Sequence, residues 1–235
     1  MPTIEQVISK IKKPPSLPNW VRLNHLRHDD TLRSITSFAL GRPRHSLMRV
    51  YDIIAARVTH RIDYRTVWNC LAKIPDPSVR ALGREILTVA LPWLDKQGME
   101  GIQVFHDMEA KYPIGRGVLV PVKPTFVLLR DGKLEPVFVI GWASVPISDY
   151  QKRLLATIIH QAILTLEGFE GSDATIIFVP RIPGSRSERH IVSWRVSEQQ
   201  LLRREELLAQ FDRFGNALDD AVPLILEEMS RRGEI

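Results

Sequence analysis

The N-terminal part of the chain places its apolar residues with a helical period. Over residues 45–60, Leu47, Val50, Tyr51 and Ile54 recur at i, i+3, i+4 and i+7. This spacing gathers the four side chains on one face of a helix and leaves the polar residues on the other. The pattern predicts an amphipathic helix with one buried side.

Comparable patterns predict three more helices, over residues 31–40, 64–74 and 76–97. Asp29 and Asp30 are expected to cap the first and Asp63 the second, because a short side-chain oxygen can accept from free backbone N–H groups at a helix start. We therefore predict a compact basic bundle of about four helices over residues 19–98. An N-terminal arm, residues 1–18, precedes it and begins with a short amphipathic helix.

The hydrophobic period changes in the second part of the chain. Apolar runs rich in β-branched residues predict strands over 116–122, 124–129, 135–143, 173–181 and 189–196. Two long helical patterns cover 148–168 and 197–233. Ser148 marks the start of one helix, and the capping box Ser197-x-x-Gln200 marks the start of the other. The fold class expected is α/β (α+β): an all-helical N-terminal domain followed by a mixed-sheet domain over residues 99–235.

The sequence Asp131-Gly132 between two of these strands is a strong signal for a two-residue hairpin turn. With such a turn, Arg130 pairs with Lys133, and counting outward places Thr125 opposite Phe138. Successive strand residues point to opposite faces of a sheet. Ile140 and Trp142 are therefore expected on the same face as Thr125 and Phe138.

This order of elements, with P-T-F-V-L-L-R-D-G-K at the hairpin, resembles the PD-(D/E)XK superfamily over about residues 100–215. Members of that superfamily share the restriction-endonuclease-like fold. In active members an Asp follows the hairpin Pro and a Glu-x-Lys ends the second strand. Here Thr125, Ile140 and Trp142 occupy those positions. Because these three residues replace the family's acids and lysine, the resemblance implies a degenerate site. Gln161 (or Gln151) matches the helix glutamine of the family weakly.

The residues in that register do not suit metal-dependent phosphodiester hydrolysis. Mg²⁺ prefers carboxylate oxygens, which a threonine and two apolar side chains do not supply. We expect no catalytic residue and no cofactor. The alternative is a nuclease that binds Mg²⁺ through relocated acids, and its candidates are Glu109, which matches a helix glutamate of some family members, with Asp107, Asp131 and Glu135.

Positive charge is concentrated in the helical part of the chain. Residues 1–112 hold 17 Lys and Arg against 11 Asp and Glu, a net of +6, whereas the remainder holds 15 against 16, a net of −1. Arginine forks suit phosphate contacts, so we expect a nucleic-acid partner, most simply DNA. The candidate binding residues are Arg42, Arg44, Arg49, Arg57, Arg61 and Arg65. The alternative is that these arginines lie on solvated helix faces or pair with nearby aspartates.

The two helices joined by T-H-R-I-D have about the lengths and linker of a helix-turn-helix, although the usual turn glycine is absent. Composition is that of a globular protein, with 44% hydrophobic and 25% charged residues. The single cysteine, Cys70, is expected in the core and excludes an internal disulfide. His25-x-x-His28 lacks a companion ligand, so a metal site is not expected. We expect a cytoplasmic protein without a membrane partner.

The leading hypothesis is a non-catalytic nucleic-acid-binding protein, a subunit of a DNA-processing or defence assembly. A third hypothesis, besides the relocated nuclease, is a protein-interaction or scaffolding module or a homo-oligomer. Its contact surface would be an apolar stripe on the C-terminal helix, made of Leu207, Leu208, Phe211, Phe214 and Leu218.

Overall fold

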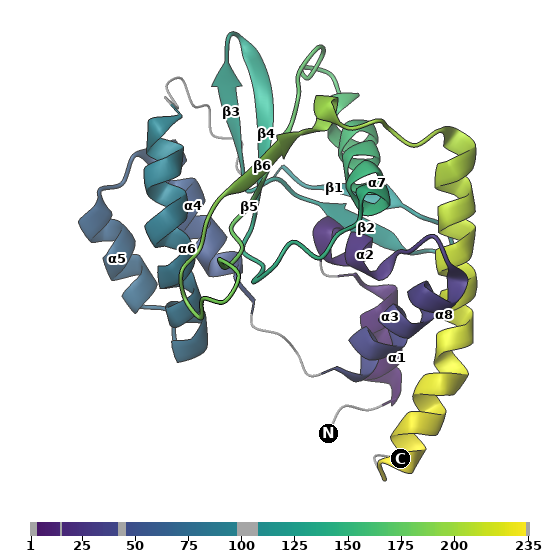
Figure 1. The fold of residues 1–235 in the computed structure, drawn as a ribbon. Helices are drawn as coiled ribbons and strands as arrows, with labels where there is room; N and C mark the ends of the chain where they lie inside the picture. The colour runs from purple at the N-terminus through teal and green to yellow at the C-terminus, as the bar shows by residue number, and fades with distance from the viewer. Residues whose placement is uncertain (1–3, 15, 42–45, 98–107, 234–235) are drawn as a thin grey trace.

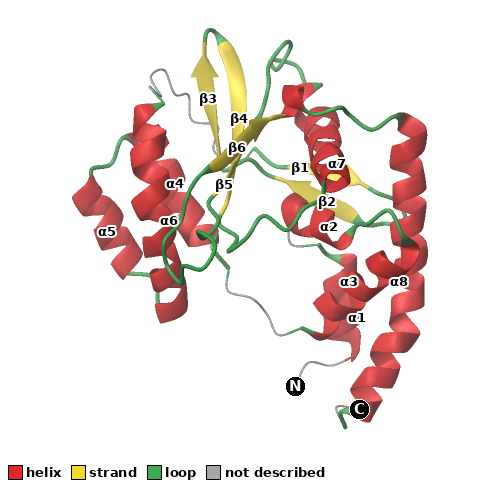
Figure 2. Ribbon diagram, viewed as in Figure 1, coloured by secondary structure: helices red, strands yellow, loops and turns green. Residues whose placement is uncertain are grey.

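The computed structural model describes residues 4–14, 16–41, 46–97 and 108–233. Its helices are α1 (Ile4–Lys12), α2 (Leu17–Leu23), α3 (His28–Leu40), α4 (Met48–His60), α5 (Tyr64–Ala72), α6 (Pro77–Lys96), α7 (Asp149–Ile159) and α8 (Arg204–Arg231). Its strands are β1 (Ala110–Pro113), β2 (Leu119–Val122), β3 (Phe126–Arg130), β4 (Lys133–Ile140), β5 (Thr175–Phe178) and β6 (Val192–Arg195). The predicted fold class is confirmed: a helical N-terminal region is followed by mixed sheets (Figures 1 and 2).

The main sheet has the strand order β3-β4-β5-β6. The pairs β3-β4 and β5-β6 are antiparallel and β4-β5 is parallel, while β1 and β2 form a separate antiparallel ribbon. The predicted hairpin register is confirmed, with Arg130 opposite Lys133. Asp131 and Gly132 both have positive φ, at 52° and 75°, as a type I′ turn requires.

The two faces of the sheet belong to two separate cores. Val137 and Val139 of β4 pack with residues of α4, α5 and α6 in one core. Phe138 and Ile140, the alternate residues of that strand, pack with α1, α2, α3, α7 and α8 in the other. In Figure 1, α4–α6 lie on one side of the sheet and the remaining helices on the other. The helices expected as one bundle over residues 19–98 are thus divided between both cores.

Helix starts differ from the predicted caps in two places. α3 begins at His28, with Arg27 as the N-cap residue, so Asp29 and Asp30 lie in its first turn rather than before it. The Ser197 capping box is wrong: a 3₁₀ turn, η2 (Val196–Glu198), stands there, and α8 begins only at Arg204. The Ser197 hydroxyl donates to Asp173 instead. The predicted caps Asp63 and Ser148 are confirmed.

The apolar stripe of α8 lies mostly in the core. Leu207, Phe214 and Leu218 are buried and Phe211 is partly buried, whereas Leu208 is 50% exposed. Most of the stripe therefore packs inside the chain and is not available to a partner. Cys70 is partly buried beside the core that α4–α6 form with the sheet.

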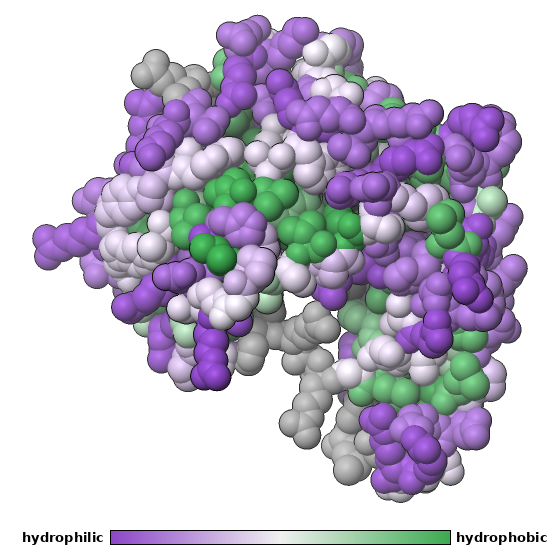
Figure 3. All heavy atoms as spheres, viewed as in Figure 1, coloured by the Kyte–Doolittle hydropathy of each residue, from purple (hydrophilic) through white to green (hydrophobic). Residues whose placement is uncertain are grey.

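The surface seen in Figure 3 is mainly hydrophilic, with apolar side chains gathered near the centre of this face. Among the described residues, no helix combines the length and the hydropathy that a membrane crossing requires.

Candidate functional site

The face of the hairpin that the sequence singled out borders a pocket of about 300 Å³. We call it the hairpin pocket and define it by six of its lining residues: Asp52, Glu109, Lys123, Thr125, Ile140 and Trp142. It lies where the N-terminal end of α4, the start of α2 and the end of β2 meet the C-terminal end of β4. The structure thus brings together Thr125, Ile140 and Trp142, which the register placed on one face, and adds Glu109, which the register did not place.

Thr125 serves the backbone of the sheet. Its N–H donates to Val137 O at 2.7 Å, and its Oγ1 accepts the Val139 N–H at 2.9 Å. The hydroxyl thereby takes the place of a backbone partner just before β3 begins. Tyr51 of α4 continues this role, because its hydroxyl accepts the Gly141 N–H at 3.0 Å. Burial raises the pKa of Tyr51, which outweighs the lowering by its Gly141 hydrogen bond.

Trp142 follows the end of β4 and is held between two groups. Its ring lies 5.7 Å from the Phe178 ring, centroid to centroid, and the Arg22 guanidinium carbon lies 4.6 Å from its centroid. Such a cation–π contact orients the indole. Trp142 is half-buried, and it forms one wall of the hairpin pocket.

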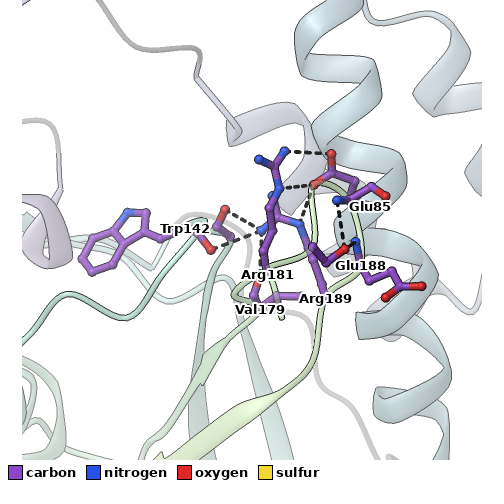
Figure 4. A network of polar contacts seen from close by, with 9 residues as sticks. Glu85, Trp142, Val179, Arg181, Glu188 and Arg189 are labelled. Atoms are coloured by element: carbon purple, nitrogen blue, oxygen red, sulfur yellow. Dashed lines mark hydrogen bonds and ion pairs between the residues drawn. The ribbon is translucent and has the colours of Figure 1, made fainter. Parts of the chain in front are cut away.

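A partly buried ion network fixes this end of the sheet to α6 (Figure 4). Glu85 of α6 accepts two hydrogen bonds from Arg181 at 2.9 and 3.0 Å and one from Arg189 Nε at 2.9 Å. Arg189 Nη1 also donates to the carbonyls of Val179, Trp142 and Gly141 at 2.6, 3.2 and 3.3 Å. Arg189 therefore joins the C-terminal ends of β4 and β5 to the helical layer behind them.

Two acidic candidates of the relocated nuclease lie away from the pocket. Asp131 is exposed in the hairpin turn. Glu135 is buried on the opposite face of the sheet from Thr125, where Arg130 lies at 3.3 Å and Arg195 at 3.7 Å, and it accepts from Thr175 Oγ1. Glu109 lines the pocket and is exposed. Asp107 lies outside the described residues.

Neither helix glutamine reaches the hairpin pocket. Gln161 lies in η1 (His160–Leu164), a π-helical extension of α7, and its Oε1 accepts from the Tyr112 hydroxyl. Gln151 is buried, and its Nε2 donates to the carbonyls of Asn24, Val21 and Arg22 at 2.7, 3.2 and 3.3 Å. Gln151 thus satisfies carbonyls at the end of α2.

Two charged residues of the pocket were missed by sequence reasoning: Asp52 of α4 and Lys123 after β2. Asp52 follows Met48 by four residues, which puts both on one helix face, but no local pattern places that face over the hairpin. Over the described part of the chain, no three His, Cys, Asp or Glu side chains are grouped to hold a metal ion.

The histidines of H-x-x-H have separate partners. His25 Nε2 lies 2.9 Å from Ser34 Oγ, and His28 Nε2 lies 3.0 Å from Asp220 Oδ2. Burial is the main cause that lowers the pKa of His25; Asp30 raises it and Arg33 lowers it further. Of the two, only His28 belongs to α3, so the two imidazoles do not share a helix face.

The six candidate arginines fall into three groups. Arg49, Arg61 and Arg65 are exposed, and no carboxylate of the described residues pairs with them. Arg57 instead binds Asp95 through two 3.1 Å hydrogen bonds and donates to Ile62 O at 2.9 Å. Its guanidinium joins α4 to α6 and is therefore already engaged within the protein. The other two, Arg42 and Arg44, lie outside the described residues.

The turn between α4 and α5 forms without the glycine that is usual in a helix-turn-helix. Arg61 ends α4 with φ 51° and ψ 33°, the left-handed conformation that glycine usually supplies at such a turn. Asp63 then caps α5 by accepting the Thr66 N–H at 2.7 Å. Residues 61–63 alone join the two helices, and this length is within the range of a helix-turn-helix turn.

One side of α5 is polar, exposed and free of carboxylates. We call it the α5 face, and it consists of Arg65, Thr66, Asn69 and Lys73. Arg65, Asn69 and Lys73 are spaced by four residues and so line up along the helix. The opposite side, with Val67 and Leu71, is buried against α4 and α6. α5 is the outermost helix on its side of the molecule (Figure 1).

Comparisons with known proteins give little further information. No protein-family model and no curated protein matches the chain. Among solved structures, the chain is similar to the crystal structure of SSO0001 over 82% of this chain and 84% of that chain, at 13% identity and a TM-score of 0.31. A likeness this weak carries no argument.

Proposed function

We propose that this protein binds nucleic acid, most simply DNA, through the α4–α5 helix pair. The observation that carries the proposal is the α5 face, an exposed row of Arg65, Asn69 and Lys73 with no carboxylate among them. Arg61 adds a fourth group with hydrogen-bond donors at the turn. The side chains of Arg and Asn make the commonest bidentate contacts with guanine and adenine, and Lys contacts phosphates.

In this proposal the α/β part is a nuclease-like scaffold that does not cleave. Thr125, Ile140 and Trp142 line the hairpin pocket, and the resembled family carries an Asp, a Glu and a Lys at the matching positions. Thr125 is engaged with the strand backbone, and Ile140 offers no ligand atom. A larger DNA-processing or defence assembly would then use the scaffold for binding rather than for hydrolysis.

The test is binding of a labelled 20-base-pair duplex at graded NaCl concentrations. Each phosphate contact steepens the slope of log affinity against log salt by about 0.9. The triple variant Arg61→Gln, Arg65→Gln, Lys73→Gln is expected to reduce that slope by about 2 to 3.

A charge-matched control replaces three exposed cations elsewhere, Lys111→Gln, Arg186→Gln and Arg204→Gln, and is expected to bind as the parent does. Affinity that ignores salt, or an equal loss in both triple variants, would remove the proposal.

A second candidate function, a nuclease with relocated acids, is favoured by one observation. Asp52 and Glu109, two carboxylates, line the same pocket as Lys123. This candidate predicts that Mg²⁺ or Mn²⁺ supports nicking of a supercoiled plasmid, and that Glu109→Ala abolishes it. The leading proposal expects no nicking by the parent protein under either ion.

A further inference from the structure

We propose that the hairpin pocket binds a nucleobase, guanine in preference to the others, with its sugar and phosphate at the mouth of the pocket. The inference rests on the proposed function, because nucleic acid is the source of the base. The inference gives the hairpin pocket a ligand, whereas the proposed function alone gives it none.

The walls of the pocket suit a flat heterocycle. Apart from Ile140 and Trp142, its apolar lining includes Leu17, Met48, Phe138, Pro18, Pro121 and Pro124. The volume of about 300 Å³ lies at the small end of the range for small-molecule sites. Proline has no N–H, so three of these walls offer carbon surface without a backbone donor. Proteins that take up an unstacked base hold it between aromatic and apolar side chains in this way.

The polar edge of the pocket selects a ligand with adjacent donors. Asp52 and Glu109 are exposed, and an ionised carboxylate only accepts hydrogen bonds. Guanine presents N1–H and its N2 amino group side by side, so one carboxylate can accept both. Adenine and cytosine place a ring acceptor beside their amino group, and that acceptor repels a carboxylate oxygen. The order of affinity expected is guanine first, then the other two.

A lysine in the pocket lining suits a ligand that carries a phosphate. Lys123 lines the pocket. Arg49 follows Met48 on α4 and lies next to Asp52 around the helix; it is exposed, and no acid of the described residues pairs with it. The lining therefore combines two carboxylates with Lys123. A guanine nucleotide matches this set, because its neutral base offers a donor edge to a carboxylate and its phosphate carries the negative charge.

The experiment is calorimetric titration of the full chain with GMP, AMP, CMP and, as a cationic probe, spermidine. GMP is expected to bind most tightly. Asp52→Asn is expected to weaken GMP about tenfold to a hundredfold, because one charge-assisted bidentate contact is lost. Glu109→Gln is the second variant, and the matched control is Asp212→Asn, an exposed aspartate of α8.

An equal affinity for the three nucleotides would overturn the inference, as would tighter binding of spermidine or GMP binding that neither pocket variant weakens. Failure of the two proposals can be told apart. Duplex binding that depends on the α5 face, with no nucleotide binding, leaves the proposed function and removes the pocket ligand. Selective GMP binding without duplex binding leaves the pocket ligand and removes the proposed function.

Discussion

Arg189 Nε donates to Glu85 Oε2 at 2.9 Å across 104 residues of sequence, and the arginine side chain has 0% exposure. The pair holds α6 against the ends of β4 and β5, next to the wall of the hairpin pocket. Burying a guanidinium costs free energy that only a charged partner and well-placed carbonyls can offset. Glu85 and the carbonyls of Gly141, Trp142 and Val179 supply both.

Glu85→Gln is expected to lower the free energy of unfolding by about 3 kcal/mol, because it leaves a buried charge without its counter-ion. Urea unfolding followed by circular dichroism measures the change. Glu188→Gln is the matched control, because that glutamate is exposed and directly precedes Arg189 in the sequence. The expected change in the free energy of unfolding is under about 0.5 kcal/mol. Equal losses in the two variants would show that Arg189 does not depend on Glu85.

The same pair predicts a dependence of stability on acid. Burial has the largest single effect on the pKa of Glu85 and raises it, but hydrogen bonds and charges from Arg181 and Arg189 outweigh burial, and the pKa is lowered. The unfolded chain, with a pKa of about 4.3 for Glu, therefore binds the proton more readily. The stability that Glu85 contributes is present above that value and is lost as the pH falls through the folded-state pKa.

The difference in unfolding free energy between the parent and Glu85→Gln should accordingly be largest at neutral pH and shrink below about pH 4. Urea titrations at a series of pH values measure it, and all other acids cancel in the comparison. A difference that stays constant down to pH 3 would contradict the assigned direction.

Gly83 of α6 lies close against α4 and α5. A Cβ built there would lie 2.6 Å from Leu71 Cδ1 and 2.9 Å from Val50 Cγ2. Gly83→Ala is expected to destabilise the protein by about 1 to 2 kcal/mol in spite of the better helix propensity of alanine. Thr88→Ala, at an exposed site of the same helix, should be neutral or slightly stabilising in the same thermal or urea unfolding assay.

Two substitutions of Arg61 are expected to differ in stability but not in duplex binding. Its left-handed backbone, with φ 51°, costs an L-residue about 1 to 2 kcal/mol. Arg61→Gly should be at least as stable as the parent, whereas Arg61→Val should lose about 1 to 2 kcal/mol because a β-branched residue adopts this conformation poorly. Both variants lack the guanidinium, so both should bind duplex equally weakly. Equal stability of the two variants would argue against the left-handed turn.

The hairpin register was predictable because every step in it is local. An Asp-Gly turn sets the pairing of Arg130 with Lys133, and the two-residue period of a strand then carries that pairing out to Thr125. The caps Asp63 and Ser148 were predictable for the same reason: each satisfies N–H groups within a few residues. The capping box predicted at Ser197 was wrong because the Ser197 hydroxyl donates to Asp173, 24 residues away in the sequence.

The division of the helices between two cores was not predictable. An amphipathic pattern shows that a helix buries one face, but it does not say against what. β4 is apolar on both faces, and that signal alone indicates a layer on each side of the sheet. Which helices form each layer depends on contacts such as the one between Glu85 and Arg189. Asp52 lines the hairpin pocket because α4 packs against the sheet, and that packing is also a long-range contact.

α4 contributes Met48 and Asp52 to the hairpin pocket at one end and leads into Arg61 and α5 at the other. Its 13 residues make a rigid rod of about 20 Å. If the proposed base and the proposed duplex both bind, an occupant of the pocket that prefers one tilt of this rod would change the affinity for the duplex. By thermodynamic reciprocity the duplex would then change the affinity for the occupant by the same factor. Under the two proposals, α4 alone would couple the pocket ligand to the duplex.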